Sequence, residues 1–193
     1  MRVLLVHAHP VASSFNASLF GMSRDRLIKA GHEVDVIDLY QDGFDPVMSE
    51  VERLNYHDTA INRQPVENYV ERLLKAQALV LVYPVWNYGF PAILKGWFDR
   101  VFLPGVSFGL VDGKVRPTLH NIEKILVVTS YGGSRFRSWL MGDPPRKIAN
   151  RMLRATIKPG APVTYLAHYA MNLSSIQTRQ AFMARVERAL DQF

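Results

Sequence analysis

Residues 83–102, which read YPVWNYGFPAILKGWFDRVF, decide the fold of this chain. The apolar run at residues 78–83 leads into this stretch and predicts a buried strand, whereas residues 91–102 predict an amphipathic helix. A strand, an aromatic-rich loop and a helix in this order are typical of a sheet that holds a planar ring at the carboxyl ends of its strands. The aromatic residues could also be ordinary core, so the other segments must decide.

Four more segments have the composition of strands. Residues 3–6 and 124–129 are short apolar runs, as in a parallel strand covered on both faces, and residues 162–167 form a fifth strand. Residues 33–39 alternate polar and apolar side chains, which indicates an edge strand. Helices are expected at residues 13–30, 47–58, 65–76, 91–102 and 175–193, with a small hairpin at 111–114 and an interrupted basic helical region near Pro144 and Pro145.

This alternation predicts one α/β domain over residues 1–193. Five strands separated by helices call for a parallel sheet with right-handed crossovers and helices on both faces. The polar second strand and the apolar third strand fit the order 2-1-3-4-5. In that order the topological switch point lies between the first and third strands, and we expect the functional site there.

Composition excludes several classes of protein. The 193 residues include no cysteine, so disulfides, thiolate metal sites and a cysteine nucleophile are ruled out, and we expect no metal site. Any redox chemistry must then come from a bound cofactor. No apolar run reaches the roughly 18 residues that a membrane span needs, and the chain enters a strand-like run at once. We therefore expect a cytoplasmic protein without membrane insertion.

The formal net charge of +6 is unevenly distributed. Between residues 135 and 158 only Asp143 opposes a group of basic residues, namely Arg135, Arg137, Arg146, Lys147, Arg151, Arg154 and Lys158. A solvated helix face, a site for nucleotide phosphate and a nucleic-acid surface are three interpretations of this segment. No nucleic-acid motif is present, so we expect no nucleic-acid partner.

The first strand is followed by a loop that could hold phosphate. His9, Ser13, Ser14 and Asn16 supply polar side chains at the start of a helix, where free amides and the helix dipole favour an anion. Neither a G-x-G-x-x-G nor a P-loop pattern occurs. The same residues are also common as plain helix caps, so this loop alone does not decide between phosphate binding and capping.

Two further loops lie beside the same switch point. Residues 84–89 offer Trp86, Asn87 and Tyr88, with Gly89 allowing close backbone approach, and these groups suit a tricyclic ring. Residues 129–134 add hydroxyls and a pair of glycines, which could also be only a turn. Together the three loops favour a cofactor that carries both phosphate and an aromatic ring.

Several of these motifs resemble one known family. The segments are Ala8 to Asn16, Asp38 to Tyr40 with Phe44 to Pro46 after it, and Pro84 to Phe102, of which Pro91 to Phe98 is the most diagnostic part. They resemble the flavodoxin-like NAD(P)H:quinone oxidoreductases of the DT-diaphorase and bacterial modulator-of-drug-activity types. The resemblance spans nearly the whole chain and implies a flavodoxin-like doubly wound sheet.

The resemblance also implies the cofactor and its contacts. The flavin phosphate tail would be held by His9, Ser13, Ser14, Phe15, Asn16 and Ser18. The isoalloxazine ring would be bordered by Pro84, Val85, Trp86, Asn87, Tyr88, Thr129, Ser130, Tyr131, Gly132 and Gly133. NAD(P)H would reduce the flavin in a ping-pong cycle, and a quinone-like acceptor would receive two electrons. The Ser-Phe-Asn loop favours FAD over the alternative, FMN.

The chain departs from the animal members of that family. Their tyrosine and histidine charge relay has no counterpart in residues 135–143, and Tyr131 is our substitute as a catalytic hydrogen-bond donor. Their longer carboxyl-terminal region has no counterpart either. An alternative function, a flavin-binding ancillary subunit of a potassium efflux system, shares the resemblance, whereas a single-electron flavodoxin is disfavoured by the basic charge. Because residues 91–102 are more than half apolar, we expect a homodimer with this helix near its interface.

Overall fold

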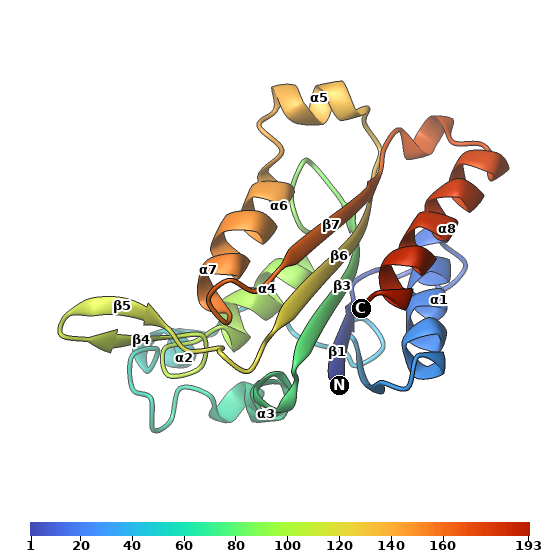
Figure 1. Ribbon diagram of the computed structural model, residues 1–193. Coiled ribbons are helices and arrows are strands. Elements are labelled where there is room, and N and C mark those ends of the chain that lie inside the picture. Colours follow the sequence, from blue (N-terminus) through green and yellow to red (C-terminus); the bar gives the residue numbers. More distant parts are fainter.

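The computed structural model describes residues 1–193, and a five-stranded parallel sheet lies at its centre (Figure 1). The sheet order is β2-β1-β3-β6-β7, which confirms the predicted order 2-1-3-4-5. Glu33–Asp38 forms the edge strand. Ala78–Val85 forms the central strand and is buried at every position. The five strands are β1 (Arg2–His7), β2 (Glu33–Asp38), β3 (Ala78–Val85), β6 (Lys124–Tyr131) and β7 (Val163–His168).

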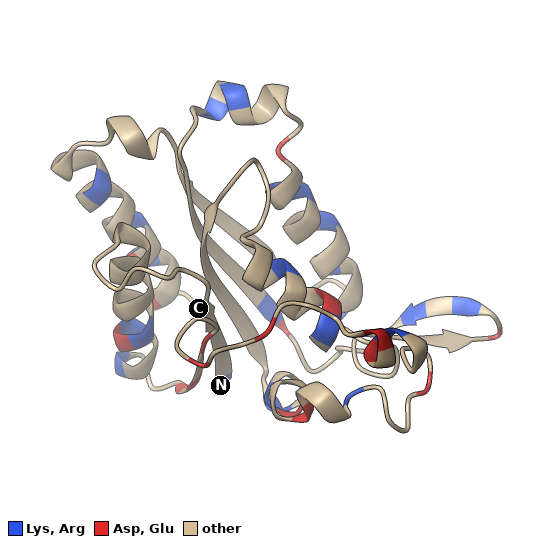
Figure 2. Ribbon diagram, turned by 180° about the vertical axis from the view of Figure 1, so that it is seen from behind, with Lys and Arg blue, Asp and Glu red and all other residues tan.

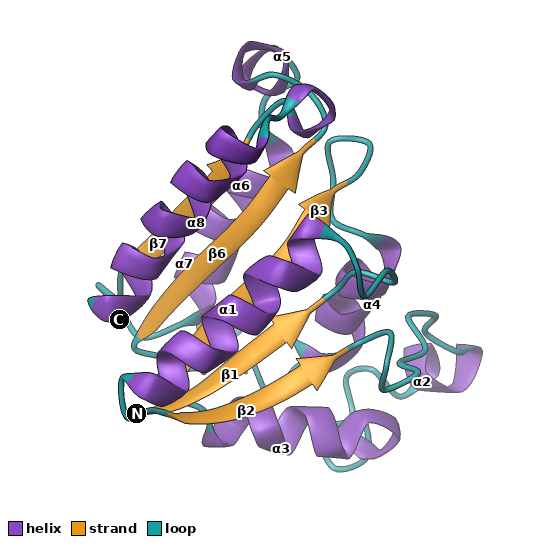
Figure 3. Cartoon of the chain, turned by 90° about the vertical axis from the view of Figure 1, so that its right-hand side faces the viewer, coloured by secondary structure: helices purple, strands orange, loops and turns teal.

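Helices cover both faces of the sheet (Figure 3). On one face α1 (Phe15–Lys29) and α8 (Ile176–Asp191) bury Leu19, Leu27 and Val186 against the strands. The other face carries the larger core. Its helical segments are α3 (Glu67–Lys75), α4 (Ala92–Val101), α6 (Pro144–Lys147), the π-helical η2 (Ile148–Leu153) and α7 (Arg154–Thr156).

Short elements fill the connections. The hairpin expected at residues 111–114 is confirmed, because β4 (Phe108–Val111) and β5 (Lys114–Pro117) pair in antiparallel register across it. The helix expected at residues 47–58 is only α2 (Glu50–Leu54), which Ser49 and Glu52 start as a capping box. The remaining short helices are η1 (Gln64–Val66), α5 (Arg135–Leu140) and η3 (Met171–Leu173). None of the helices combines the length and the apolar composition that a membrane crossing needs.

The two central strands are longer than predicted. β3 and β6 continue to pair beyond residues 83 and 129, with Pro84 opposite Ser130 and Val85 opposite Tyr131. The predicted loops at residues 84–89 and 129–134 therefore begin only at Trp86 and at Gly132. This ladder fixes the backbone from which both loops leave the sheet.

The helix α4 is held against the chain that follows β2. A Cβ on Gly96 would lie 2.3 Å from the carbonyl oxygen of Pro46, so only glycine permits this approach. The Arg100 side chain donates to the Glu52 carboxylate at 2.8 Å and to the Asp45 carbonyl. These contacts attach the segment between β2 and α3 to α4, the helix that follows the aromatic loop.

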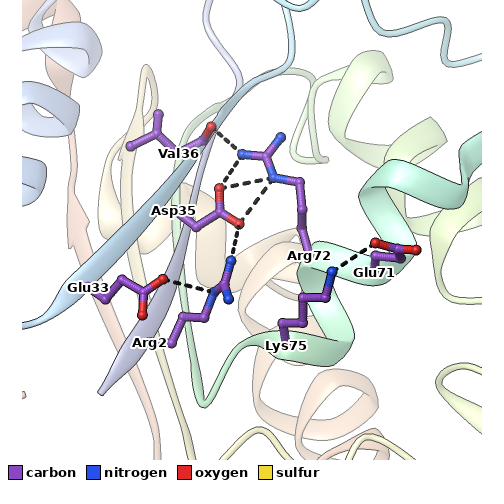
Figure 4. A network of polar contacts seen from close by, with 7 residues as sticks. All are labelled: Arg2, Glu33, Asp35, Val36, Glu71, Arg72 and Lys75. Carbon is purple, nitrogen blue, oxygen red and sulfur yellow. Dashed lines mark hydrogen bonds and ion pairs between the residues drawn. The ribbon is translucent and has the colours of Figure 1, made fainter.

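A network of charges joins β1, β2 and α3 on the edge of the sheet (Figure 4). The Arg72 guanidinium donates to the Asp35 carboxylate at 2.5 and 3.0 Å and to the carbonyl oxygen of Val36. The Arg2 guanidinium lies 3.8 Å from the same carboxylate and 3.5 Å from the carboxylate of Glu33. These contacts hold the half-exposed edge strand against the helix beneath it.

Candidate functional site

The loop after β1 uses much of its polar chemistry to begin α1. The Ser14 hydroxyl accepts the amide N–H of Ala17 at 3.0 Å, and the Ser18 hydroxyl donates to the Ser14 carbonyl at 3.3 Å. The capping interpretation is therefore correct for the Ser14 side chain. Ser13 is exposed, and the His9 ring nitrogen Nδ1 accepts the amide of Val11 at 3.0 Å.

Asn16 differs from its neighbours in this loop. Its side chain is only 3% exposed, yet neither its amide nitrogen nor its amide oxygen has a hydrogen-bond partner. A buried polar group without a partner is costly, and native proteins rarely tolerate one. The first backbone amides of a helix also lack intrahelical acceptors. In α1 these free amides belong to Phe15 and Asn16. These unsatisfied groups suit a polar ligand such as phosphate.

The loop after β3 is a strained two-residue turn. Trp86 and Gly89 exchange backbone hydrogen bonds of 3.2 and 2.8 Å across it. Its central residues, Asn87 and Tyr88, have φ angles of 48° and 57°. Positive φ at both centres is the type I′ geometry, which a bulky residue such as tyrosine seldom adopts. Strain of this kind is found mostly where a turn has a function.

The second and third loops meet around one cavity of about 340 Å³. A Cβ on Gly133 would lie 3.6 Å from the Tyr88 hydroxyl, and one on Gly132 would lie 3.6 Å from the Asn172 amide nitrogen. Side chains at these glycines would therefore fill the space between the loops. The lining residues are Val85, Asn87, Tyr88, Tyr131, Gly132, Gly133, Arg137 and Asn172.

The first loop lies beside the second loop on the β1 side and lines no part of this cavity. The His9 ring lies 5.8 Å from the ring of Trp86, which is 41% exposed. The Phe15 ring instead packs edge-on against His168, at 5.7 Å between centroids. All three predicted loops thus lie at the carboxyl ends of the strands, as the topology predicts. Because the Phe15 ring is packed against His168, Phe15 can offer a ligand only its backbone amide.

Tyr131 does not fit the catalytic role that we predicted for it. Its side chain is 1% exposed, and its hydroxyl donates to the Asp143 carboxylate at 2.6 Å. Its oxygen also lies 2.6 Å from the Tyr165 hydroxyl, which must donate because the Tyr131 proton is already used. Burial, reinforced by Tyr165 and Asp143, raises the pKa of Tyr131 far above its usual value. The hydroxyl has no proton left for a flavin or a substrate.

Three other predicted ring contacts face the sheet rather than the cavity. The Thr129 hydroxyl is buried and donates to the Tyr83 carbonyl at 2.6 Å. Pro84 is buried within β3, and Ser130 is buried opposite it in β6. Their side chains belong to the ladder because β3 and β6 extend beyond the predicted loop starts. Of the predicted ring contacts in the two strands, only Val85 and Tyr131 reach the cavity.

A partly buried polar network lies beside the cavity. The Arg146 guanidinium donates to Asp143 at 2.8 Å and to the Tyr169 hydroxyl at 2.7 Å, and its carbon lies 4.4 Å from the centre of the Tyr165 ring. The Tyr169 ring in turn lies 4.7 Å from that of Tyr131. One carboxylate therefore fixes the end of β6, the end of β7 and the start of α6 relative to one another.

Comparison with known proteins identifies the family. A family model described as having a flavodoxin-like fold matches residues 1–192. The chain belongs to this flavodoxin-like family. The NAD(P)H:quinone oxidoreductase of Methanothermobacter marburgensis is 29% identical, with a TM-score of 0.85 over 99% of this chain and 98% of that one.

Curated relatives of this flavodoxin-like chain carry related names. An uncharacterized NAD(P)H oxidoreductase of Escherichia coli is 33% identical over 69% of this chain and 66% of the relative. The NAD(P)H dehydrogenase [quinone] 1 of Cavia porcellus is 29% identical over 73% of this chain and 57% of the relative. The chain thus matches less than two thirds of the length of these relatives.

Some cavity residues of the flavodoxin-like site were not among those predicted for it. Asn172, which follows β7, lines the cavity, whereas His168 at the end of that strand packs beside Phe15 and does not line it. All carboxyl ends of a parallel sheet meet at one edge, so the segment after the fifth strand could have been included on topology alone. Arg137 was recognised only as a basic residue, because no sequence signal shows which way a short helix faces.

A larger cavity, of about 630 Å³, lies elsewhere on the flavodoxin-like domain. It borders α4 and the β4–β5 hairpin, with Phe98, Phe102 and Phe108 among its walls. Lys95 and Asp99 on its rim neutralise each other at 2.5 Å. None of Asn87, Tyr88, Gly132 and Gly133 lines it, so we assign the candidate site to the smaller cavity, where the turns that follow β3 and β6 meet.

Proposed function

We propose that the chain is a flavin-dependent NAD(P)H:quinone oxidoreductase. The observation that carries the proposal is the meeting of strand-end loops around the 340 Å³ cavity, with the unsatisfied Asn16 at the adjoining helix start. A phosphorylated planar ring needs a space of this kind beside a set of free donors. The names of the relatives support the reaction class.

The residues present fit a flavin. The amides of Phe15 and Asn16 and the Asn16 side chain would hold its phosphate tail, because these donors lack partners. The backbone of residues 86–88 and of Gly132 and Gly133 would border its ring, where the absence of side chains leaves the space open. His9, Ser13 and Trp86 would close the side toward β1.

A bound flavin would supply the redox chemistry, namely hydride transfer from NAD(P)H and two-electron reduction of a quinone in a ping-pong cycle. The protein orients the reactants and sets the charge around them. Arg137 is the cationic side chain in the cavity wall, and its charge favours groups that become negative during reduction. Tyr131 acts through its contact with Asp143, by holding the end of β6 in place.

A visible spectrum of the purified protein, followed by steady-state oxidation of NAD(P)H with a benzoquinone, tests this proposal. We expect a flavin spectrum and parallel-line kinetics in double-reciprocal plots. Bound flavin with negligible quinone turnover would favour the ancillary potassium-efflux subunit over the enzyme. A colourless protein that neither FAD nor FMN reconstitutes would reject both functions.

Asn16→Ala tests the fit of the flavin directly. The side chain makes no hydrogen bond in the protein alone, so the variant should fold and should bind flavin about 10-fold more weakly or worse. Flavin fluorescence titration of the apoprotein measures the affinity. Ser18→Ala is the control, because the Ser18 hydroxyl serves the helix and we expect a smaller effect. Equal affinities in Asn16→Ala and the natural sequence would remove Asn16 from the phosphate site.

We propose FAD rather than FMN as the cofactor, on the resemblance of the Ser14-Phe15-Asn16 loop. Heat release of the bound flavin and chromatography against both standards decide between them. The cytoplasmic location expected from the sequence remains a prediction.

We also propose a homodimer. The apolar side chains of α4, such as Trp97 and Val101, are buried in the chain's own core, so the helix itself offers only Ala92, Lys95 and Asp99 to a partner. The large cavity beside α4, flanked by the exposed Leu110 and Met152, is the surface that a second copy would cover. Light scattering should give twice 21.9 kDa, and the monomer mass would reject the dimer.

A further inference from the structure

The short helix α5 separates the ring-binding cavity from a second cavity. Arg137 lines the first, whereas Arg135 and Trp139 line the second, which has a volume of about 370 Å³. This division follows from helix geometry, because residues four apart share a face and a residue midway between them points to the other side. The second cavity continues over Gly142, which precedes α6, to Lys147 at the end of that helix.

The second cavity has an excess of positive charge. Its carboxylate, Asp143, is already used by Arg146 at 2.8 Å and by the Tyr131 hydroxyl at 2.6 Å. Arg135 and Lys147, in contrast, form no ion pair. A Cβ on Gly142 would lie 3.4 Å from the Lys147 ammonium nitrogen, so this charge lies directly over the glycine. Figure 2 shows basic residues on α5 and along the helical segment that follows it.

Trp139 gives this cavity an aromatic wall. Its side chain is 70% exposed, and its one aromatic neighbour is Phe136, which is itself exposed, at 6.0 Å between ring centres. The indole therefore contributes little to the core. An exposed indole beside two uncompensated cations suits a phosphorylated purine nucleoside, because the ring can stack on the base and the cations can bind phosphate.

We infer that this second cavity binds the adenosine 2′-phosphate half of NADPH, with Trp139 against the adenine and with Arg135 and Lys147 on the 2′-phosphate. The inference rests on the proposed function, in which the nicotinamide half occupies the neighbouring cavity across α5. NADH lacks the 2′-phosphate and leaves both cations without a partner. The chain is therefore selective for NADPH. Of the remaining basic residues, Arg137 faces the first cavity and Arg146 is held by Asp143, whereas Arg151 and Arg154 are exposed surface charges. Lys158 is already paired with Glu123 at 2.9 Å.

Binding of adenosine 2′,5′-bisphosphate, which contains no nicotinamide, tests the inference apart from catalysis. Calorimetry on the purified flavin-loaded protein should give an affinity at least about 10-fold higher than that of adenosine 5′-monophosphate. Arg135→Gln and Lys147→Gln should each remove most of this difference. Arg154→Gln is the matched control, because it removes the same charge from the exposed face of α7, and it should leave the difference intact.

Trp139→Ala separates stacking from charge. It should weaken both nucleotides about equally, by about 10-fold, because both contain the adenine. Equal affinity for the two nucleotides in the natural sequence, an equal loss in Arg154→Gln, or the same affinity for inorganic phosphate as for the bisphosphate would each overturn the inference. Quinone reduction by NADH would still be measurable in that case, so the proposed function would stand. A protein without flavin that still binds the bisphosphate would instead reject the proposed function alone.

Discussion

Two polar networks use a carboxylate in different ways. Asp35, near the start of the sheet, faces two guanidinium groups and joins β1, β2 and α3 (Figure 4). Asp143, near the carboxyl ends, holds one guanidinium and one tyrosine hydroxyl beside a cavity. The first network connects elements that are all structural. The second fixes backbone that lines the proposed flavin site, so the two should respond differently to substitution.

Removal of the Asp35 carboxylate should have the largest effect on stability. In Asp35→Ala, Arg72 would lose its carboxylate partner in a partly buried place, and Arg2 would keep only the exposed Glu33 as a counter-charge. We expect the free energy of unfolding to fall by about 2 kcal/mol, less than for a fully buried pair because water reaches these groups. Urea denaturation measures the change, and flavin affinity should stay the same.

Glu71→Ala is the control for Asp35→Ala. Glu71 pairs with Lys75 on the surface of the same helix, and such pairs contribute less than about 1 kcal/mol. A similar loss in both variants would mean that the network in Figure 4 has no special role.

Asp143→Asn should affect both stability and function. The amide keeps the shape but loses the charge that holds Arg146 and Tyr131, so we expect a loss of about 1.5 kcal/mol in unfolding free energy. The ends of β6 and β7 should also become less fixed, which should lower quinone turnover. Denaturation and steady-state kinetics measured on the same sample test both expectations. A stability loss with unchanged turnover would place Asp143 in the same class as Asp35.

Tyr88→Gly should change stability in the opposite direction. Tyr88 has a positive φ of 57°, and Asn-Gly is a preferred pair for a type I′ turn, so the variant relieves strain. We expect the flavin-free protein to gain about 1 kcal/mol while flavin affinity falls. Thermal unfolding of the apoprotein and fluorescence titration test this pair of effects. A destabilised apoprotein would show that the tyrosine ring contributes more by packing than the turn costs.

The smallest expected effect is a dependence on pH. Burial, aided by the positive charge of Arg179, lowers the pKa of His168. The unfolded chain therefore binds the proton more readily, and stability should fall as the pH drops through the unfolded value of about 6.5. His168→Gln should lose less stability than the natural sequence between pH 7 and pH 5.5. Parallel denaturation series at both pH values check this, and equal slopes would contradict it.

The sequence predicted the fold well because the strands are distinct in composition. Residues 33–39 alternate as an edge strand must, and residues 78–83 are apolar throughout, so strand order follows from pattern alone. The three strand-end loops were also predicted in the right place. The π-helical turn at Ile148–Leu153 was not predicted, since it has no signature in residue type.

Individual side chains of the site were harder to predict. Thr129 was predicted at the border between strand and loop and Tyr131 within the loop, but β6 runs to Tyr131, and the two hydroxyls turn toward Tyr83 and Asp143. The left-handed turn at Asn87 and Tyr88 was unforeseen because tyrosine disfavours that conformation. Such features depend on tertiary contacts rather than on local preference.

The position of α5 between two cavities has a thermodynamic consequence. The same six-residue backbone carries Arg137 toward one cavity and Arg135 toward the other. A ligand that orders α5 from one cavity therefore also orders the wall of the other cavity. Any free energy of coupling between the two cavities must be reciprocal. A nucleotide that tightens flavin binding by some factor is therefore itself bound more tightly by the same factor when flavin is present.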